Sequence, residues 1–202
     1  MALYLPNASV MVRYCVALLT ILVLTACAEQ AERDASVPEQ SIAELERPAP
    51  VVSGTDQEGK AFSSSSIRGS YWLASFMFTT CQTICPALNT VQADIARAYA
   101  SRGLRFVSIS TDPEHDTPAA LKQYAQRYGA VSGTWWMLSM PIDTVLNVAT
   151  RGFAVMGPEH PDMHSTRFVL VSPNQTIVDY FDSADTADVR RLRTTLDKLL
   201  PA

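Results

Sequence analysis

The chain has 202 residues, of which 48% are hydrophobic, and its 16 Lys and Arg residues are outnumbered by 20 Asp and Glu residues. A chain of this length can bury a sizeable core. The formal net charge of −4 and the lack of a basic run argue against nucleic-acid partners and against electrostatic binding to anionic lipid. Of the four cysteines, only Cys81 and Cys85 fall outside the N-terminal segment, and one pair is too few for a scaffold that is held together by disulfides.

The N-terminus begins with an apolar stretch at residues 10–26 that carries a single charge. Its core, Val16–Leu24, is shorter than the roughly 20 residues that a membrane-spanning helix needs. The stretch ends in Leu24-Thr25-Ala26-Cys27, which resembles the cleavage motif of bacterial lipoproteins. We therefore expect residues 1–26 to be a lipoprotein signal peptide and Cys27 to carry lipid. An uncleaved signal anchor with an incidental cysteine is the alternative.

Residues 27–47 are rich in Ala, Glu and Pro and poor in large apolar residues, which is typical of a flexible tether. Residues 48–202 suit one folded domain. This organisation predicts a protein of the bacterial cell envelope that is anchored to a membrane by lipid and faces the periplasm. Because Cys15 lies in the signal segment and Cys27 at its end, only two cysteines remain for the folded domain.

The domain alternates between strand-like and helix-like patterns. We expect a β-hairpin at Val51–Phe62, strands at Trp72–Phe78, Leu104–Ser110, Trp135–Leu138, Arg167–Ser172 and Thr176–Phe181, and helices at Pro86–Ser101, Thr117–Tyr128, Ile142–Thr150 and Thr186–Leu200. Long crossover helices imply parallel pairing in the first part, and the short turn at Pro173-Asn174 implies an antiparallel hairpin in the last part. The order predicts an α/β fold, a thioredoxin-like single domain with an added N-terminal β-hairpin.

The segment Cys81-Gln82-Thr83-Ile84-Cys85-Pro86 lies between the first central strand and the helix that follows it. We expect Cys81 in the loop or at the N-cap and Cys85 in the first helical turn, where the helix dipole favours thiolate over thiol. Thiolates attack disulfides and also bind soft metals. The two sulfurs would then be close enough for a disulfide or a shared metal. Two buried free cysteines that only fill space are the alternative.

A third candidate group is His164, which stands just before the strand expected at Arg167–Ser172. In a thioredoxin-like layout, the loop that enters this strand faces the cysteine loop and carries a cis-proline, which this chain lacks there. Two thiolates and one imidazole suit Cu(I), whereas a structural zinc site usually has four ligands. A loop histidine bonded to backbone is the alternative. His115 and His160, set among Pro, Glu and Asp, have the pattern of exposed loop residues.

The polar segment Ser110–Pro118 is a further candidate for a functional role, after the cysteine segment and His164. Asp112 follows the second central strand at the edge of the sheet where the cysteines are expected. It is a candidate for orienting a ligand, contacting a partner or supplying an oxygen ligand, whereas Asp116 is expected to support the turn or cap the helix. A simple turn followed by a helix cap explains most of the run.

These segments resemble the Sco/SenC family. Phe78–Pro86 is similar to its Cys-x-x-x-Cys-Pro segment, Ser108–Pro118 to its Asp-Pro-x-x-Asp-Thr-Pro segment, and His164 to its metal-binding histidine. The resemblance covers about residues 48–200, in order. Gln82 departs from the proline that many members carry after the first cysteine, a change that leaves the ligands intact and bears on the stiffness and redox potential of the loop.

The resemblance implies a membrane-tethered domain that binds copper, as Cu(I) or Cu(II), through Cys81, Cys85 and His164. It implies delivery of copper to the binuclear copper site of cytochrome c oxidase, or reduction of that site's cysteines. The implied partners are the copper-site subunit and a copper donor protein. Two other hypotheses remain. One is a thiol-disulfide oxidoreductase of the cell envelope, an enzyme in which Cys81 attacks and Cys85 resolves. The other is peroxide reduction, for which no arginine is close in sequence to the cysteines.

Overall fold

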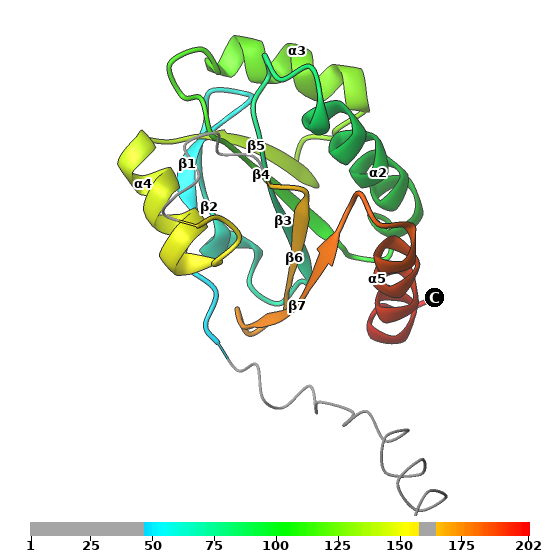
Figure 1. Ribbon diagram of the computed structural model, residues 1–202. Coiled ribbons are helices and arrows are strands. Elements are labelled where there is room, and N and C mark those ends of the chain that lie inside the picture. The colour runs from blue at the N-terminus through cyan, green and yellow to red at the C-terminus, as the bar shows by residue number, and fades with distance from the viewer. Residues whose placement is uncertain (1–46, 158–164) are drawn as a thin grey trace, which may run out of the picture. The chain divides into compact units, whose positions relative to one another are not determined.

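The computed structural model describes residues 47–157 and 165–202, which form one mixed sheet with strand order β2-β1-β5-β4-β3-β6-β7 and helices on both faces (Figure 1). The strands are β1 (Ser53–Asp56), β2 (Ala61–Ser63), β3 (Trp72–Met77), β4 (Arg105–Ser110), β5 (Trp135–Ser139), β6 (Arg167–Val171) and β7 (Ile177–Asp182). The helices are η2 (Ser64–Ile67), α2 (Ile84–Tyr99), α3 (Pro118–Tyr128), α4 (Ile142–Asn147), η3 (Val148–Gly152) and α5 (Thr186–Leu199). Within these two ranges, none of the helices is both long and apolar enough to cross a bilayer.

The centre of the sheet is parallel and its flanks are antiparallel. Strand β4 pairs in parallel with β3 and with β5, whereas β1 pairs antiparallel with β2 and β5, and β6 pairs antiparallel with β3 and β7. The carboxyl ends of β3, β4 and β5 therefore meet at one edge, where the cysteine loop leaves β3. The predicted parallel core, N-terminal hairpin and C-terminal hairpin are all confirmed.

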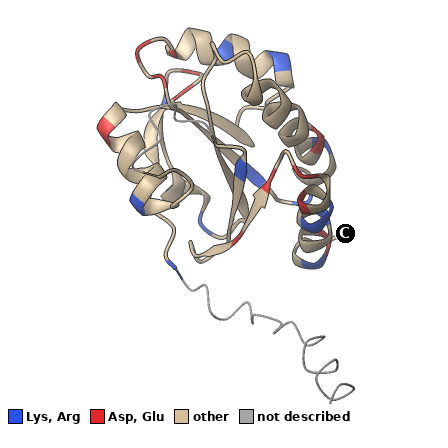
Figure 2. Cartoon of the chain, viewed as in Figure 1, with Lys and Arg blue, Asp and Glu red and all other residues tan. Residues whose placement is uncertain are grey.

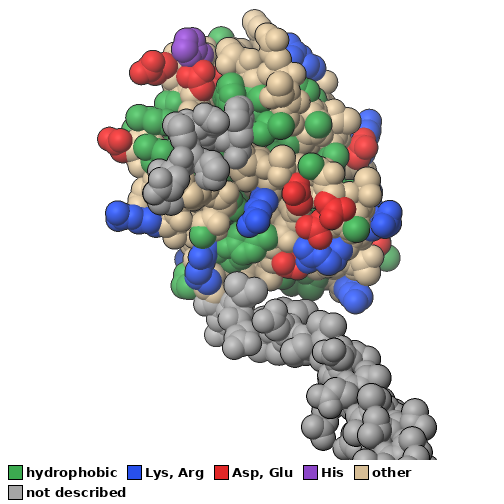
Figure 3. Space-filling view, viewed as in Figure 1, with side chains coloured by type: hydrophobic (Ala, Val, Ile, Leu, Met, Phe, Trp, Pro, Cys, Tyr) green, Lys and Arg blue, Asp and Glu red, His purple; other side chains and the backbone are tan. Residues whose placement is uncertain are grey.

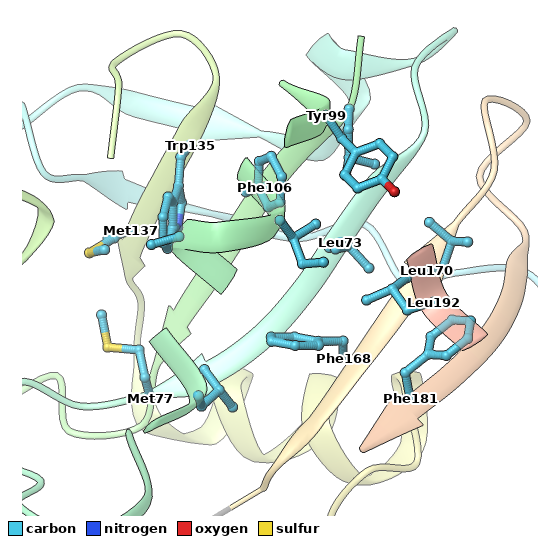
Figure 4. Close-up of a cluster of buried hydrophobic side chains, with 14 of the residues drawn as sticks. Leu73, Met77, Tyr99, Phe106, Trp135, Met137, Phe168, Leu170, Phe181 and Leu192 are labelled. Atoms are coloured by element: carbon cyan, nitrogen blue, oxygen red, sulfur yellow. The ribbon is translucent and has the colours of Figure 1, made fainter. Parts of the chain in front are cut away.

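Both faces of the sheet carry an apolar cluster, which is why all six residues of β3 are buried. Leu73 and Met77 face the cluster that α2, α3 and α5 cover (Figure 4). Trp72 and Phe76 face the opposite cluster, which α4 and η3 cover. Burying each large apolar side chain contributes about 1.5–3 kcal/mol, so the two clusters together fix β3 in the middle of the molecule.

The N-terminal hairpin, β1 and β2, extends the sheet next to β5, and the side chain of Gln57 continues its pairing with β5. Strand β1 pairs with β5 at Thr55 and Asp56 and then turns away. The Gln57 amide continues the pairing: its Nε2 donates to the Trp135 carbonyl oxygen at 2.9 Å, and its Oε1 accepts from the Met137 N–H at 2.8 Å. Gln57 is itself buried. A buried amide thus satisfies backbone groups of β5 that would otherwise lack partners.

The expected helix boundaries agree with the structure to within two residues, except at one place. Helix α3 begins after Thr117, whose hydroxyl accepts from the Ala120 N–H, and ends at Gly129 in the left-handed region with a φ of 68°. The single helix expected at Ile142–Thr150 is instead divided, because α4 continues into the π-helical turn η3. Such turns are rare and locally widen a helix.

The residues at the start of the described chain hold η3 in place. Arg47 donates to the carbonyl oxygen of Gly152 at 2.9 Å and to the hydroxyl of Tyr180 at 2.8 Å. The Tyr180 hydroxyl in turn donates to the Phe153 carbonyl oxygen at 2.8 Å. A Cβ atom at Gly152 would lie only 2.7 Å from the ring of Pro50, so this contact requires glycine.

Charged residues of both signs are interspersed along the helices and loops (Figures 2 and 3). Several of them form exposed ion pairs, such as Lys122 with Glu58 and Arg102 with Asp197, each at 2.7 Å. Exposed pairs of this kind contribute about 0–1 kcal/mol, so they adjust the surface and do not determine the fold.

We predict that Gly152→Ala destabilises the domain by about 1–3 kcal/mol, because the new methyl group overlaps the Pro50 ring and the π-helical turn must shift. Urea denaturation of residues 28–202, followed by circular dichroism, measures the change. The exposed neighbour Arg151 supplies the control, since Arg151→Ala is expected to stay within about 0.5 kcal/mol of the parent. Equal midpoints for both variants would contradict the close contact.

Candidate functional site

Strand β3 and helix α2 place the two cysteines. After β3 the chain turns, with the Cys81 N–H donating to the Phe78 carbonyl oxygen at 3.3 Å, and α2 begins at Ile84. The N-cap residue Thr83 makes no side-chain capping bond. The sulfur of Cys81 accepts instead from the Cys85 N–H at 3.4 Å. The Cys81 sulfur therefore takes the position that a capping oxygen usually occupies at a helix start.

Both thiols are free and lie at the edge of the apolar cluster beneath α2. Cys81 is 7% exposed and Cys85 is 3% exposed, so Cys81 is the more accessible by a small margin. Cys81 stands in the loop and Cys85 in the first turn of α2, as the sequence predicts. The arrangement leaves two buried free thiols close together at the start of α2.

The two thiols differ strongly in acidity. Burial raises the pKa of Cys81, but hydrogen bonds with the side chain and backbone of Cys85 and with Thr83 outweigh burial, so the net pKa is lowered. Burial, followed by the hydrogen bond to Cys81, raises the pKa of Cys85 to about 12. The expectation that the helix start favours thiolate at both positions is thus wrong for Cys85, where desolvation dominates.

A carboxylate that the sequence did not single out as a site residue touches the cysteine loop. Asp116, which has no solvent exposure, accepts hydrogen bonds from the N–H of Thr79 at 3.1 Å and from the Thr79 hydroxyl. The Ser110 hydroxyl donates to the other carboxylate oxygen at 2.5 Å. The sequence signal that could have pointed to Asp116 was the pair of hydroxyl residues Thr79, before Cys81, and Ser110, at the end of β4, because buried hydroxyls need an acceptor.

Asp112 has contacts of a different kind. Its carboxylate lies 2.9 Å from the Nδ1 atom of His115, and its N–H donates to the Ser110 hydroxyl at 3.1 Å. Hydrogen bonding to Asp112 raises the pKa of the exposed His115 imidazole. These contacts lie between the end of β4 and the start of α3. A role for Asp112 toward a ligand or partner therefore stays a prediction.

A buried amide supports α2 behind the cysteines. The Nδ2 atom of Asn89 donates to the Cys85 carbonyl oxygen at 2.9 Å and lies 3.2 Å from the Tyr124 hydroxyl. Burial raises the pKa of Tyr124, and hydrogen bonding to Tyr128 adds to the increase. The contact joins α2 to α3 directly under the first turn that carries Cys85.

Two expected site residues, Cys27 and His164, lie outside the described residues, as does His160, which was expected to be an exposed loop residue. The chain re-enters at Ser165, two residues before β6. Because β6 runs antiparallel to β3, with Ala74 opposite Val169, the start of β6 lies at the edge where β3 ends. Among the residues that the structure describes, no group of three or more His, Cys, Asp or Glu residues has an arrangement able to hold a metal.

Comparison with known proteins identifies relatives of the chain. It is 31% identical over 137 residues to the SCO1 protein homolog of Bacillus subtilis (strain 168), covering 64% of this chain and 71% of that protein. Several other curated relatives are matched over about half of their length or less.

Two solved structures share the fold. BsSco, described as a member of the Sco family of cytochrome c oxidase assembly proteins with a disulfide switch, superposes with a TM-score of 0.67 at 25% identity, covering 76% of this chain and 94% of that one. Bradyrhizobium japonicum ScoI with copper bound has a TM-score of 0.59 at 24% identity, covering 75% and 98%. The expected thioredoxin-like fold is confirmed, and a thioredoxin domain is among the structural neighbours.

A family model matches most of the chain. The model of SCO1/SenC proteins aligns with residues 52–200, which include β1 through α5 and both cysteines of the folded domain. The chain therefore belongs to the SCO1/SenC family.

Proposed function

We propose that this chain binds copper through Cys81, Cys85 and His164, and that it delivers copper to the binuclear copper site of cytochrome c oxidase or reduces that site's cysteines. The observation that carries the proposal is the pair of adjacent free thiols at the start of α2. Membership of the SCO1/SenC family supports it, as does the copper bound to one structural relative.

The chemistry of the donor set fits Cu(I). Two thiolates and an imidazole are soft to intermediate donors, and three such ligands suit an ion that accepts low coordination. Cys81 has a lowered pKa, whereas Cys85 must lose a proton from a thiol with a pKa of about 12 before it can bind. Copper capture is therefore coupled to proton release, mainly at Cys85.

The topology supports His164 as the third ligand. This residue precedes Ser165 and β6, and the start of β6 lies at the edge of the sheet that bears the cysteine loop. Transfer then proceeds by ligand exchange, in which the ligands of the recipient replace the cysteines and the histidine one at a time.

A second candidate function is thiol–disulfide exchange. The unequal thiols favour it, because Cys81 with the lowered pKa is suited to attack a partner disulfide, and Cys85 then attacks the mixed disulfide. Two electrons pass to the partner, whose disulfide becomes two thiols, while a Cys81–Cys85 disulfide forms here. The disulfide switch described for BsSco makes this a specific alternative.

We also propose that the N-terminal segment anchors the domain. Its signal-like stretch at residues 1–26, Cys27 as the lipid site and the tether at residues 27–47 favour a lipoprotein of the bacterial cell envelope. The lipid anchor would keep the domain at residues 48–202 close to membrane-bound partners. The copper-site subunit of the oxidase and a copper donor are the partners proposed.

We predict that reduced residues 28–202 bind one Cu(I) tightly, and that Cys85→Ala and His164→Ala each weaken binding by at least about tenfold, because each removes a ligand. Competition with a chromogenic Cu(I) chelator measures the affinity. His115→Ala, which removes the described exposed imidazole, is the control and should bind like the parent. Binding that does not depend on His164 would refute the three-ligand site.

We predict that iodoacetamide modifies Cys81 well before Cys85 at neutral pH. The ordinary pKa of a cysteine thiol is 9.0, so the modification rate at Cys81 should reach half of its maximum below pH 9.0. The modification rate at Cys85 should reach half of its maximum only near pH 12. Mass spectrometry of tryptic peptides from metal-free protein follows both sites as a function of pH. Equal rates at the two cysteines across the range would show that the thiols are equivalent and would remove the support for directional exchange.

A further inference from the structure

The contact between Asp116 and the cysteine loop joins segments that are far apart in the sequence. Its partner Thr79 lies 37 residues upstream and two residues before Cys81. The neighbouring Thr117 already caps α3 through the Ala120 N–H, so capping does not require Asp116. The carboxylate points inward and is fully buried, although an exposed position would avoid the cost of desolvation.

The contact lies just beyond the end of the strand ladder. The pairing of β3 with β4 ends at Met77 and Ser110, and one more backbone bond, from the Thr111 N–H to the Met77 carbonyl oxygen at 2.9 Å, extends it. Beyond that point the segments that follow β3 and β4 are no longer joined by the hydrogen-bond pairing of the sheet. Thr79 then donates both its N–H and its hydroxyl to Asp116, and Ser110 holds the same carboxylate from the side of β4.

We propose that Asp116 is a positioning residue that holds the cysteine loop in its binding geometry before copper or a partner thiol arrives. Asp116 acts through Thr79, which fixes the backbone two residues before Cys81 and so keeps the Cys81 sulfur at the N–H of Cys85. A loop that is already ordered loses less entropy on binding, so affinity rises without any new contact to the ligand.

This inference differs from a role for Asp112. The Asp112 carboxylate bonds to His115 on the same loop, whereas the Asp116 carboxylate crosses to the loop that carries Cys81. The two residues are four positions apart and face different ways. Of the two carboxylates, that of Asp116 contacts the cysteine loop, through Thr79.

Two readouts test the inference in reduced residues 28–202, a piece that includes the whole compact unit of residues 45–202. The first is Cu(I) affinity, which rests on the proposed function. The second is amide hydrogen exchange of the peptide covering residues 78–85, which needs no copper and reports whether the loop is held. The variants are Asp116→Asn, Thr79→Val, which removes one donor, and Thr79→Ser, which keeps it.

Asp56→Asn is the matched control, because Asp56 is also a buried carboxylate that accepts two backbone N–H groups, but it lies in the β1–β2 hairpin. We expect Asp116→Asn to lower Cu(I) affinity by about ten- to hundredfold and Thr79→Val by about three- to tenfold. Exchange in the peptide should accelerate in both. Thr79→Ser should restore both readouts, and Asp56→Asn should lower the melting temperature without changing either.

The proposal is overturned if folded Asp116→Asn and Thr79→Val leave both readouts within about twofold of the parent, or if Asp56→Asn changes them equally. If Asp116→Asn does not fold, Thr79→Val and Thr79→Ser decide the matter. If the parent itself fails to bind Cu(I), the proposed function is wrong, and the exchange experiment still decides whether Asp116 holds the loop.

Discussion

Parallel pairing of β3 with β4 is the constraint on which the rest of the structure depends. Because both strands end at the same edge of the sheet, the loop that carries Cys81 and the loop that carries Asp116 leave the core side by side. The two apolar clusters fix this edge by burying β3 from both faces. The strand topology therefore determines which side chains can meet at the site.

The same arrangement makes two identical side chains unequal. Cys81 lies at the N-terminus of α2, where the backbone N–H of Cys85 stabilises the negative charge of the Cys81 thiolate. Cys85 lies one turn deeper, against the apolar cluster, where loss of water favours the neutral thiol. A dithiol in which one thiol loses its proton readily and the other does not is suited to reacting in two steps, whether the partner is a metal ion or a disulfide.

The sequence was sufficient for the order of elements, the pairing pattern and the positions of both cysteines, since these follow from local periodicity and from the strand–helix junction. It was insufficient for Asp116, Asn89 and Gln57. Each of these buried polar groups bonds to a partner whose neighbourhood exists only after folding, such as Trp135, which is 78 residues away from Gln57. Local patterns also cannot weigh desolvation against the helix dipole, which is why the acidity of Cys85 was mispredicted.

The Gln57 amide has a consequence for how molecules of this chain meet one another. Without the hairpin, β5 would be the outermost strand of a parallel core and would present a row of open backbone groups, which readily recruit strands from other chains. The hairpin and the Gln57 side chain occupy those groups and move the sheet's border outward to β2, which is only three residues long. The hairpin thus reduces the exposed backbone that this edge of the sheet offers to strands of other chains, whereas the opposite edge is formed by the longer strand β7.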